Sequence, residues 1–468
     1  MKHLHVIGVC GTAMAGLAAL AQESGWRVTG SDAGVYPPMS LFLASRGIAI
    51  QDGFRAENLE PAPDLVLVGN AISRGNPELE ALLERGLPFR SGAQWLFEHV
   101  LEGRHPVVVT GTHGKTTTTS LTAWLWEQAG LAPGFMIGGI PLDFGVGVRF
   151  PGASPWVMVE GDEYDTAFFD KRPKFLHYHP RTLILHNLEY DHADIYPDME
   201  AIRQQFRLLL RLVPATGLIL ANGDDPEIRA VIKQAHGPVI QYGLEGDYPF
   251  AARLDRPDGR AWTLLRDGEP LLRIEWTLLG RHNVMNGLAA SAAALSRGLP
   301  PERVRAGLES FQGVARRLQL RFEARGIAVY DDFAHHPTAI ATTLAGMREA
   351  VGPARIWAVV EPRSNTMRRR IHQDRLPAAL AAADGVVLTR PAPRGLAPDD
   401  LLDVDLLAAQ INATGPGRAV VVDGAPQAVD YLLKGLGSGD HVVIMSNGGF
   451  GGIHDRLLEA LGGPASGE

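Results

Sequence analysis

The chain has 468 residues, enough for about three domains of ordinary size. It carries 44 Lys and Arg against 52 Asp and Glu, and the resulting formal net charge of −8 argues against nucleic-acid binding through bulk positive charge. The single cysteine, Cys10, excludes an internal disulfide framework and a cysteine-based zinc site.

The first hundred residues alternate short apolar runs with helical patterns. Strands are predicted at 4–7, 27–29, 48–50, 65–68 and 88–90, with helices at 13–24, 38–45 and 77–84. This alternation is typical of a doubly wound parallel sheet covered by helices. The apolar run before Gly8 is too short for a signal peptide, and no apolar stretch is long enough for a membrane-spanning helix. We therefore expect a cytoplasmic protein.

A glycine-containing loop follows the first strand and opens a helix, as a dinucleotide-binding turn does. Its glycines are Gly8, Gly11 and Gly16, so it departs from the G-x-G-x-x-G pattern. Asp32 follows the second strand, where a ribose-binding carboxylate would stand. These features favour a pyrophosphate nucleotide without separating a nicotinamide cofactor from a nucleotide sugar. Cys10 is interpreted as a small packed residue rather than a nucleophile.

A second α/β unit begins with a buried strand at 106–110 that runs into the sequence TGTHGKTT, residues 110–117. A strand, a glycine loop and a helix in succession suit phosphate binding, because backbone N–H groups and the helix dipole both attract an anion. Lys115 supplies a cation for the terminal phosphates, and the Thr116 hydroxyl suits Mg²⁺. The spacing is shorter than in the general P-loop pattern, since Gly111 lies only three residues before Gly114.

Polar runs follow two further strands of this unit. The strand at 157–159 ends in an acidic run, Glu160 to Asp165, which would be read as a solvated turn if it stood alone. Beside a phosphate loop, such acids commonly hold Mg²⁺. The strand at 182–185 is followed by His192, which is either a metal ligand or a surface histidine. Together the two runs predict a divalent-cation site near the loop.

Short alternating segments with Asp-Gly turns at 258–259 and 267–268 predict antiparallel hairpins. Asn283 and Asn286 then share one face of an Ala-rich helix, where they either contact a nucleotide or, for Asn283, cap the helix. A third α/β unit follows, with strands at 328–330, 356–360, 386–388, 419–422 and 442–445. Its run 331–338 is either a site or a polar turn. We place the domains at 1–105, 106–318 and 319–468.

The ordered runs GTHGKTTT, EGDEYD, NLEYDH, GRHNVMN, Arg316-Arg317 and DDFAHHPT resemble the motifs of the Mur ligase family of ATP-dependent amide-bond synthetases. The resemblance covers residues 8 to about 340, and the remaining unit fits the family's third domain. It implies Rossmann-like N- and C-terminal domains. The central domain is expected to be P-loop ATPase-like, mostly parallel with a small antiparallel sheet. It also implies ATP and Mg²⁺ as cofactors and a role in peptidoglycan synthesis or recycling, and hence in cell-wall biogenesis.

The resemblance also implies site residues. Lys115, Glu160 and His192 are expected to be catalytic, and Thr116, Glu160 and His192 to hold Mg²⁺. The expected ATP ligands are Gly111, Thr112, His113, Gly114, Lys115, Thr116, Thr117, Asn283, Asn286, Arg317, Asp332 and His335. The expected UDP-sugar ligands are Gly8, Gly11, Thr12, Ser31, Asp32 and Asn70, and the expected peptide ligands are Arg363, Ser364, Asn365 and Asn447. Some family members carry a carbamylated lysine near the metals, and Lys171 and Lys174 lie in that region.

Two substrate classes remain open within the family. The HHPT run and the 8–16 loop are similar to members that join UDP-N-acetylmuramate to L-alanine. Stretches at 35–40, 69–77, 168–172, 361–367 and 445–452 are similar to members that join it to the tripeptide L-Ala-γ-D-Glu-meso-diaminopimelate. We expect the tripeptide reaction, through an acyl phosphate, with the L-alanine reaction as the alternative. A nicotinamide-dependent oxidoreductase or a nucleotide sensor would leave the phosphate loop and the acidic run unexplained.

Overall fold

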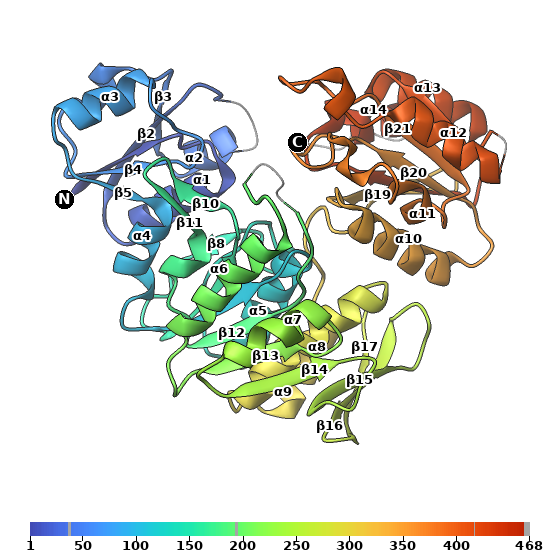
Figure 1. The fold of residues 1–468 in the computed structure, drawn as a ribbon, viewed down its shortest axis with the longest axis horizontal. Coiled ribbons are helices and arrows are strands. Elements are labelled where there is room, and N and C mark those ends of the chain that lie inside the picture. The colour runs from blue at the N-terminus through green and yellow to red at the C-terminus, as the bar shows by residue number, and fades with distance from the viewer. Residues whose placement is uncertain (36–38, 192–194, 416, 463–468) are drawn as a thin grey trace.

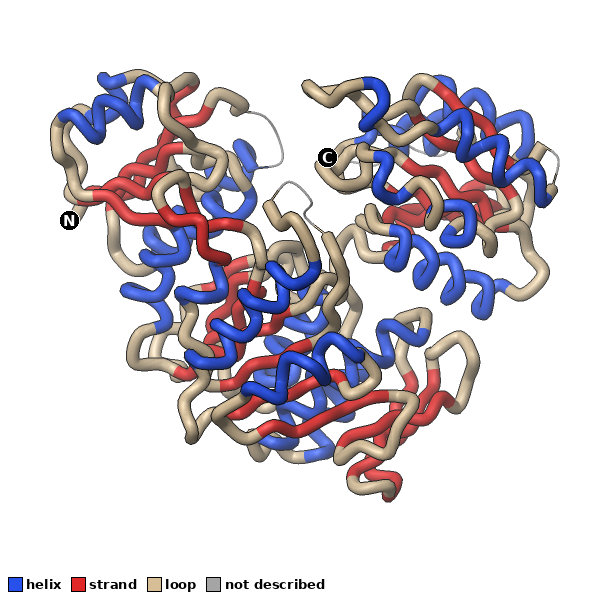
Figure 2. Tube along the Cα trace, viewed as in Figure 1, coloured by secondary structure: helices blue, strands red, loops and turns tan. Residues whose placement is uncertain are grey.

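The computed structural model describes residues 1–35, 39–191, 195–415 and 417–462. His192 and part of the 35–40 stretch lie outside these residues. In Figure 1 the N-terminal unit, in blue, and the C-terminal unit, in orange, each lie above the central unit in green and yellow. Helices cover both faces of the main sheets (Figure 2). No helix in the described part of the chain is long and apolar enough to cross a membrane.

The N-terminal unit is a parallel sheet with strand order β3-β2-β1-β4-β5. Its strands are β1 (His3–Ile7), β2 (Arg27–Asp32), β3 (Ala49–Asp52), β4 (Leu65–Val68) and β5 (Phe89–Ser91), and its helices α1 (Thr12–Glu23), α2 (Met39–Ser45), α3 (Pro77–Glu84) and α4 (Gly92–Leu96). Because β1 pairs with both β2 and β4, the strand order reverses there. The loops after β1 and β4 therefore part at the carboxyl edge, where doubly wound sheets bind ligands.

The central unit is built on a ten-stranded sheet with the order β17-β16-β15-β14-β13-β12-β6-β9-β7-β8. Its parallel part contains β6 (His105–Thr110), β7 (Gly134–Met136), β9 (Trp156–Gly161), β12 (Thr182–Leu185), β13 (Leu218–Asn222) and β14 (Val239–Gly243). Because β6 pairs with both β9 and β12, the loops that follow these three strands meet at one edge. Those three loops are the phosphate loop, the acidic run and the run that begins with His186.

Antiparallel strands border this sheet, as the Asp-Gly turns indicated. At one end, β15 (Phe250–Leu254) pairs parallel with β14 and antiparallel with β16 (Ala261–Arg266), which pairs antiparallel with β17 (Glu269–Glu275). At the other end lies β8 (Val148–Arg149), and β10 (Asp165–Ala167) and β11 (Asp170–Pro173) form a separate small pair. The helices are α5 (Lys115–Gln128), α6 (Met199–Leu212), α7 (Pro226–Val231), α8 (Arg281–Ser296) and α9 (Pro301–Ser310). Helix α5 begins at Lys115, directly after the glycine loop.

The C-terminal unit has the strand order β18-β19-β23-β20-β21-β22. The strands are β18 (Gln319–Ala324), β19 (Ile327–Asp332), β20 (Ile356–Val360), β21 (Gly385–Thr389), β22 (Ala419–Val422) and β23 (His441–Met445). The helices are α10 (Pro337–Val351), α11 (Leu376–Ala379), α12 (Val404–Thr414), α13 (Ala425–Gly435) and α14 (Ile453–Ala460). Among the described strands of this unit only β18 is antiparallel, and its weakly apolar pattern was not predicted as a strand.

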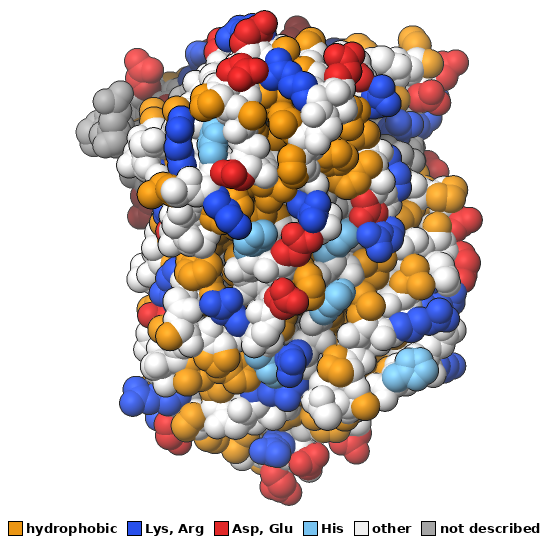
Figure 3. Space-filling model, turned by 90° about the vertical axis from the view of Figure 1, so that its left-hand side faces the viewer, with side chains coloured by type: hydrophobic (Ala, Val, Ile, Leu, Met, Phe, Trp, Pro, Cys, Tyr) orange, Lys and Arg blue, Asp and Glu red, His pale blue; other side chains and the backbone are white. Residues whose placement is uncertain are grey.

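The N-terminal and central units share one apolar core, whereas most of the apolar core of the C-terminal unit is separate. One apolar core runs from Leu17 of α1 through Val148 of β8 into the central unit. At Gly16 of α1, a Cβ would lie 2.7 Å from Val148 Cγ1, so the close approach requires a residue without a side chain. The C-terminal sheet has a separate core on each face, around Leu344 and Leu432, and the first also includes Leu279 of the central unit. On the face that Figure 3 shows, acidic and basic side chains are interspersed.

Candidate active site

The phosphate loop joins β6 to α5 through two glycines in unusual conformations. Gly111 has φ +140° and Gly114 has φ +79°, a region that favours glycine. At Gly114 a Cβ would also lie 2.5 Å from Asn286 Oδ1. Among the described residues no side chain caps the N-terminus of α5, so its first N–H groups are available to an anion.

The segment after β12 braces this loop. Asn187 Oδ1 accepts a hydrogen bond from the His113 N–H (2.7 Å), and Asn187 Nδ2 donates to the His113 carbonyl (3.0 Å). The backbone N–H of Glu189 donates to Thr112 Oγ1 (2.9 Å). The loop is therefore held in shape by a neighbouring strand end. In the sequence this segment stands out for His192 and carries no signal for Asn187, because both partners of Asn187 belong to the distant loop.

Lys115 folds back over its own loop. Its Nζ donates to the Gly111 carbonyl (2.7 Å) and pairs with Glu163 Oε2 (2.8 Å). Burial lowers the pKa of Lys115, but Glu163 and Asp162 outweigh it, and the pKa is raised overall. The lysine is therefore a permanent cation beside the loop. The sequence placed Glu163 in the acidic run but did not identify it as the partner of Lys115.

Oxygen ligands suited to Mg²⁺ meet at the start of α5. The Thr116 hydroxyl donates to Glu160 Oε1 (3.0 Å), and Glu160 Oε2 accepts from the Gly138 N–H (2.7 Å). Arg317 Nη2 donates to Thr116 Oγ1 (3.0 Å). A hydroxyl and a carboxylate beside a phosphate-binding helix terminus are the hard donors that Mg²⁺ prefers. The residues present therefore fit a magnesium ion bound together with a nucleotide phosphate.

A cavity of about 610 Å³, here called the junction cavity, is lined by all three units. The N-terminal unit contributes Thr12, and the central unit contributes the phosphate loop and Glu160. From the C-terminal unit come His335 and the predicted peptide ligands Arg363, Ser364, Asn365 and Asn447. Residues separated by hundreds of positions thus face one space.

Arg363 reaches this cavity because Gly448 lacks a side chain. A Cβ at Gly448 would lie 1.2 Å from Arg363 Nη1, so any larger residue would displace the guanidinium. Within the described residues no carboxylate lies within ion-pair distance of Arg363. Nearby, the buried Asn447 Oδ1 has no hydrogen-bond partner in the described part of the chain. This wall is thus suited to a ligand that carries both a carboxylate and an N–H donor.

A second cavity of about 570 Å³, the N-terminal cavity, lies at the carboxyl edge of the first sheet. It is lined by the predicted UDP-sugar ligands Gly8, Gly11, Thr12, Asp32 and Asn70. Asp32 Oδ2 accepts from the Cys10 N–H (2.8 Å), which fixes the carboxylate beside the glycine loop. Burial, then the Asp32 carboxylate, raises the pKa of the Cys10 thiol, which disfavours a reactive thiolate.

Ser31 does not fit its expected role. Its hydroxyl donates to Glu78 Oε1 (2.9 Å), and the residue is 0% exposed beneath the sheet edge. It is also absent from the lining of the N-terminal cavity. The strand alternation explains this position: Asp32 lines the cavity, and the preceding side chain points to the opposite face of the sheet. We therefore omit Ser31 from the proposed ligands.

A third cavity of about 340 Å³, the helix cavity, lies between α8 and the start of α10. Asn283, Asn286, Arg317 and Asp332 line it together with the phosphate loop. Asn286 Nδ2 donates to Asn283 Oδ1 (3.0 Å), so the two amides share a face. The N-cap of α8 is Gly280, which removes the alternative of Asn283 as the cap. Burial raises the pKa of Asp332 to about 6, although Arg317 opposes the shift.

The chain crosses from the central to the C-terminal unit along the wall of this site, through Arg316 (φ +62°), Arg317 and Leu318 (φ +49°). Arg316 Nη2 donates to the carbonyls of Ser446 (2.8 Å) and Gly448 (2.6 Å) in the C-terminal unit. Arg317 turns the other way, to Thr116. Consecutive arginines are therefore anchored on opposite sides of the crossing.

Of the two lysine candidates, only Lys174 lies at the site. It pairs with Asp162 (2.8 Å) and lines both the junction and the N-terminal cavities. Lys171 is exposed and pairs with Asp165 (2.7 Å). The three cavities are contiguous, because Thr12 and Lys174 line the first two, and Thr116 and Arg317 line the junction and helix cavities. Ligands on either side of the phosphate loop would thus meet in the junction cavity.

A Rossmann-like unit, a phosphate-loop unit and a third α/β unit around one shared cavity define a nucleotide-dependent enzyme of three domains. The chain matches the profiles described as "Mur ligase family, catalytic domain" (residues 3–104), "Mur ligase middle domain" (109–294) and "Mur ligase, glutamate ligase domain" (316–448). The chain belongs to the Mur ligase family, as the sequence motifs indicated.

Similar proteins are found among both substrate classes of the family. The UDP-N-acetylmuramate–L-alanyl-γ-D-glutamyl-meso-2,6-diaminoheptandioate ligase of Escherichia coli K12 is 47% identical, over 98% of each chain. The UDP-N-acetylmuramate–L-alanine ligase of Acetivibrio thermocellus is 33% identical, over 98% of this chain and 96% of that protein. The crystal structure of a murein peptide ligase from Psychrobacter arcticus covers 100% of both chains with a TM-score of 0.75 and 39% identity.

Proposed function

We propose that this protein is an ATP-dependent ligase that joins the carboxylate of UDP-N-acetylmuramate to the amino group of L-Ala-γ-D-Glu-meso-diaminopimelate in peptidoglycan recycling. The single observation that carries the proposal is the contiguity of the three cavities at the phosphate loop. The similarity to the tripeptide ligase, 47% against 33% for the L-alanine ligase, favours the tripeptide. Because the reaction consumes ATP and a UDP-linked precursor, we propose a cytoplasmic location.

The proposed division of labour follows the three cavities, with domain boundaries near residues 105 and 318. The N-terminal cavity takes the UDP sugar through the glycine loop, Asp32 and Asn70. The helix cavity takes the nucleoside of ATP, with the Asn283–Asn286 pair and Asp332 as polar contacts. The junction cavity takes the reacting groups and the peptide, whose carboxylate faces Arg363.

When bound, ATP supplies the phosphoryl group that converts the carboxylate to an acyl phosphate, and Mg²⁺ offsets the charge of the phosphates. Thr116 and Glu160 would hold the metal ion, and His192 is proposed as a further ligand on the family resemblance. Lys115 exchanges its contact with Glu163 for the terminal phosphate. Its positive charge then offsets the negative charges of the phosphate and of the attacking carboxylate. The N-terminal N–H groups of α5 add dipole stabilisation at the same point.

Opposite walls of the junction cavity position the two substrates. The carboxylate enters from the side of Thr12, and the peptide amine enters from the side of Arg363 and Asn447. The C-terminal unit closes this space and excludes water that would hydrolyse an acyl phosphate. Phosphate leaves as the amide bond forms, and the amine gives up its proton.

A substrate panel tests the proposal. The purified protein is incubated with ATP, Mg²⁺ and UDP-N-acetylmuramate, together with the tripeptide, free L-alanine or no amine, while ADP release and product mass are measured. We expect the tripeptide to give ADP and one UDP-muramoyl tripeptide per ADP. Preferential use of L-alanine would assign the protein to the other branch of the family. UDP-sugar binding without ATP turnover would overturn the ligase assignment.

A further inference from the structure

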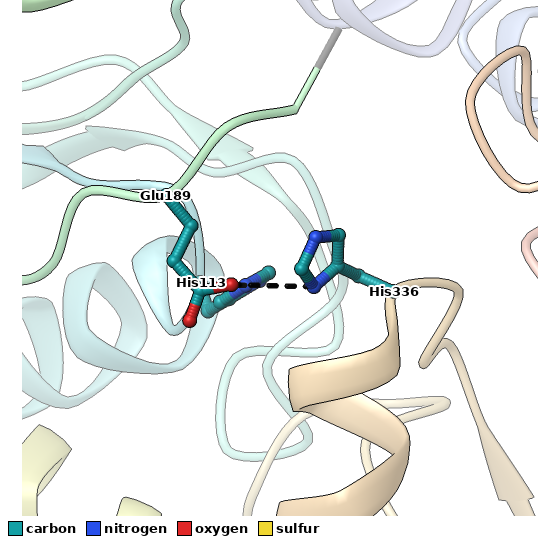
Figure 4. Close-up of side chains that lie close together, drawn as sticks. All are labelled: His113, Glu189 and His336. Atoms are coloured by element: carbon teal, nitrogen blue, oxygen red, sulfur yellow. Dashed lines mark ion pairs between the residues drawn. The ribbon is translucent and has the colours of Figure 1, made fainter. Parts of the chain in front are cut away.

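Three side chains that offer metal-ligand atoms meet where the central and C-terminal units touch (Figure 4). His113 comes from the phosphate loop, Glu189 from the segment after β12, and His336 from the start of α10. His113 Nε2 lies 3.7 Å and His336 Nδ1 lies 3.6 Å from Glu189 Oε2. The three ligand atoms lie within 4.8 Å of one another.

These separations are too long for hydrogen bonds but close to the spacing around a metal ion. Ligands about 2.0–2.1 Å from a tetrahedral zinc ion lie roughly 3.3–3.4 Å apart. The Glu189 oxygen is therefore near the required distance from each imidazole, and the two imidazole nitrogens, which lie within 4.8 Å of each other, must approach more closely for an ion to bind. Rotation of the two imidazole side chains would complete the geometry.

The burial of the cluster also points to a missing ligand. His336 is 1% exposed, and the buried His113 Nε2 has no hydrogen-bond partner among the described residues, although it faces the carboxylate. Both nitrogens of the neighbouring His372, whose ring centroid is 4.7 Å from that of His336, are likewise without partners in the described chain. Buried polar atoms are normally paired, so such a concentration of unpaired imidazole nitrogens is unusual.

The chemical nature of the three donor groups also suits a transition-metal ion. Burial, followed by His113, lowers the pKa of His336 to about 3, so its imidazole is neutral. Burial raises the pKa of Glu189, but His113 and the Thr338 hydroxyl outweigh this effect and bring it to about 2. Two imidazole nitrogens and one carboxylate oxygen form a donor set typical of zinc sites, and nitrogen donors favour Zn²⁺, Co²⁺ and Ni²⁺ over Mg²⁺.

Two residues, Thr338 and Arg375, compete for the same atoms. The Thr338 hydroxyl donates to Glu189 Oε2 (2.8 Å), which a carboxylate oxygen can accept while it also binds a cation. The Thr338 N–H donates to His336 Nδ1 at 3.3 Å, a long contact that metal binding would replace. Arg375 Nη2 lies 3.4 Å from Glu189 Oε2, but its side chain is half exposed and can turn to solvent.

We propose that His113, Glu189 and His336 bind a divalent transition-metal ion of the zinc class, with water in the remaining position. This site is distinct from the oxygen donors Thr116 and Glu160. Because its ligands come from two units, a bound ion fastens the phosphate loop to the C-terminal unit. Such an ion restrains the opening that releases product, so micromolar zinc is expected to inhibit turnover.

Cobalt titration of the full chain tests the site directly. The visible absorption of Co²⁺ reports nitrogen coordination in a tetrahedral site, and millimolar Mg²⁺ is present throughout to occupy the oxygen-donor site. We expect one Co²⁺ per chain, displaced by Zn²⁺. Glu189→Gln and His336→Gln should each weaken binding at least tenfold, the scale at which even outer-shell changes act. Arg375→Ala should tighten binding, because a competing cation is removed.

Controls keep the test decisive. His236→Gln alters an exposed histidine elsewhere on the central unit and should bind Co²⁺ like the unmodified chain. Thermal unfolding without metal identifies any variant that fails to fold, and Glu189→Gln, which keeps the shape of the side chain, remains as the second test. The proposal is overturned if Co²⁺ gives no tetrahedral spectrum in the presence of Mg²⁺. It is equally overturned if folded Glu189→Gln and His336→Gln proteins bind as the His236 control does.

Discussion

Replacement of Lys115 should damage the protein in two separable ways. Its Nζ lies 2.8 Å from Glu163 Oε2, and the two side chains are only 12% and 6% exposed. Removal of one member of a buried ion pair typically costs about 3–5 kcal/mol, because the other charge stays in a poorly solvating environment. Lys115→Met should therefore lower the free energy of unfolding by about 3 kcal/mol, measured by urea denaturation. Loss of a charge that stabilises the transferring phosphoryl group should lower turnover by about 10²–10³-fold.

The double variant Lys115→Met/Glu163→Gln separates the two effects. It removes both charges, so most of the lost free energy of unfolding should return, while ADP release stays as low as in the single variant. If ADP release recovers together with stability, Lys115 acts through folding alone and its assigned role is wrong. If Lys115→Met unfolds at the same urea concentration as the unmodified chain, the inference from the buried pair is refuted.

Three further predictions rest on local geometry. Gly114→Ala should lose ATP turnover, because the new Cβ would lie 2.5 Å from Asn286 Oδ1. The control Gly130→Ala has a similar φ, and its Cβ would meet no described atom within 4 Å. It should cost only about 1–2 kcal/mol of stability and keep activity. Gly448→Ala should raise the KM for the peptide and leave the KM for ATP unchanged. The control Gly449→Ala, with open space around it, should change neither KM. Equal effects of Gly448→Ala on both KM values would contradict the role of Arg363. Because the pKa of Asp332 is raised to about 6, its contribution to stability is fullest below pH 4 and is lost as pH rises through 6. The difference in unfolding free energy between the unmodified chain and Asp332→Asn should therefore fall between pH 4 and 6, and a constant difference would show that the pKa is not raised.

The sequence pattern predicted what is encoded locally. The strands at 65–68, 356–360 and 419–422 and the helix at 77–84 have the predicted bounds, because each is a short periodic segment with clear ends. The phosphate loop was predicted for the same reason: a strand, its glycines and a helix are consecutive in the chain. The family membership then followed from the order of such local runs.

Contacts between distant segments could not be predicted in this way. Glu163 and Asn187 are bonded to loop residues 48 and 74 positions away, and no local period reports such pairings. Ser31 was wrongly predicted as a ligand because it stands next to Asp32 in the motif. The alternation of side chains along the strand turns Ser31 away from the cavity and toward Glu78. The fit of Arg363 over Gly448 depends on two loops of the C-terminal unit. These features need the fold before they can be recognised.

The anchoring of Arg316 and Arg317 on opposite sides of the crossing has a consequence for protein engineering. A chimaera that exchanges the C-terminal unit between relatives would ordinarily be joined within the connecting segment. Here that segment carries side chains fitted to both partners: Arg316 to the carbonyls of Ser446 and Gly448, and Arg317 to Thr116. A junction placed between these two arginines keeps each with its native neighbours. A junction on either side pairs one guanidinium with a foreign surface, so the choice of a single peptide bond decides whether the hybrid retains its active site.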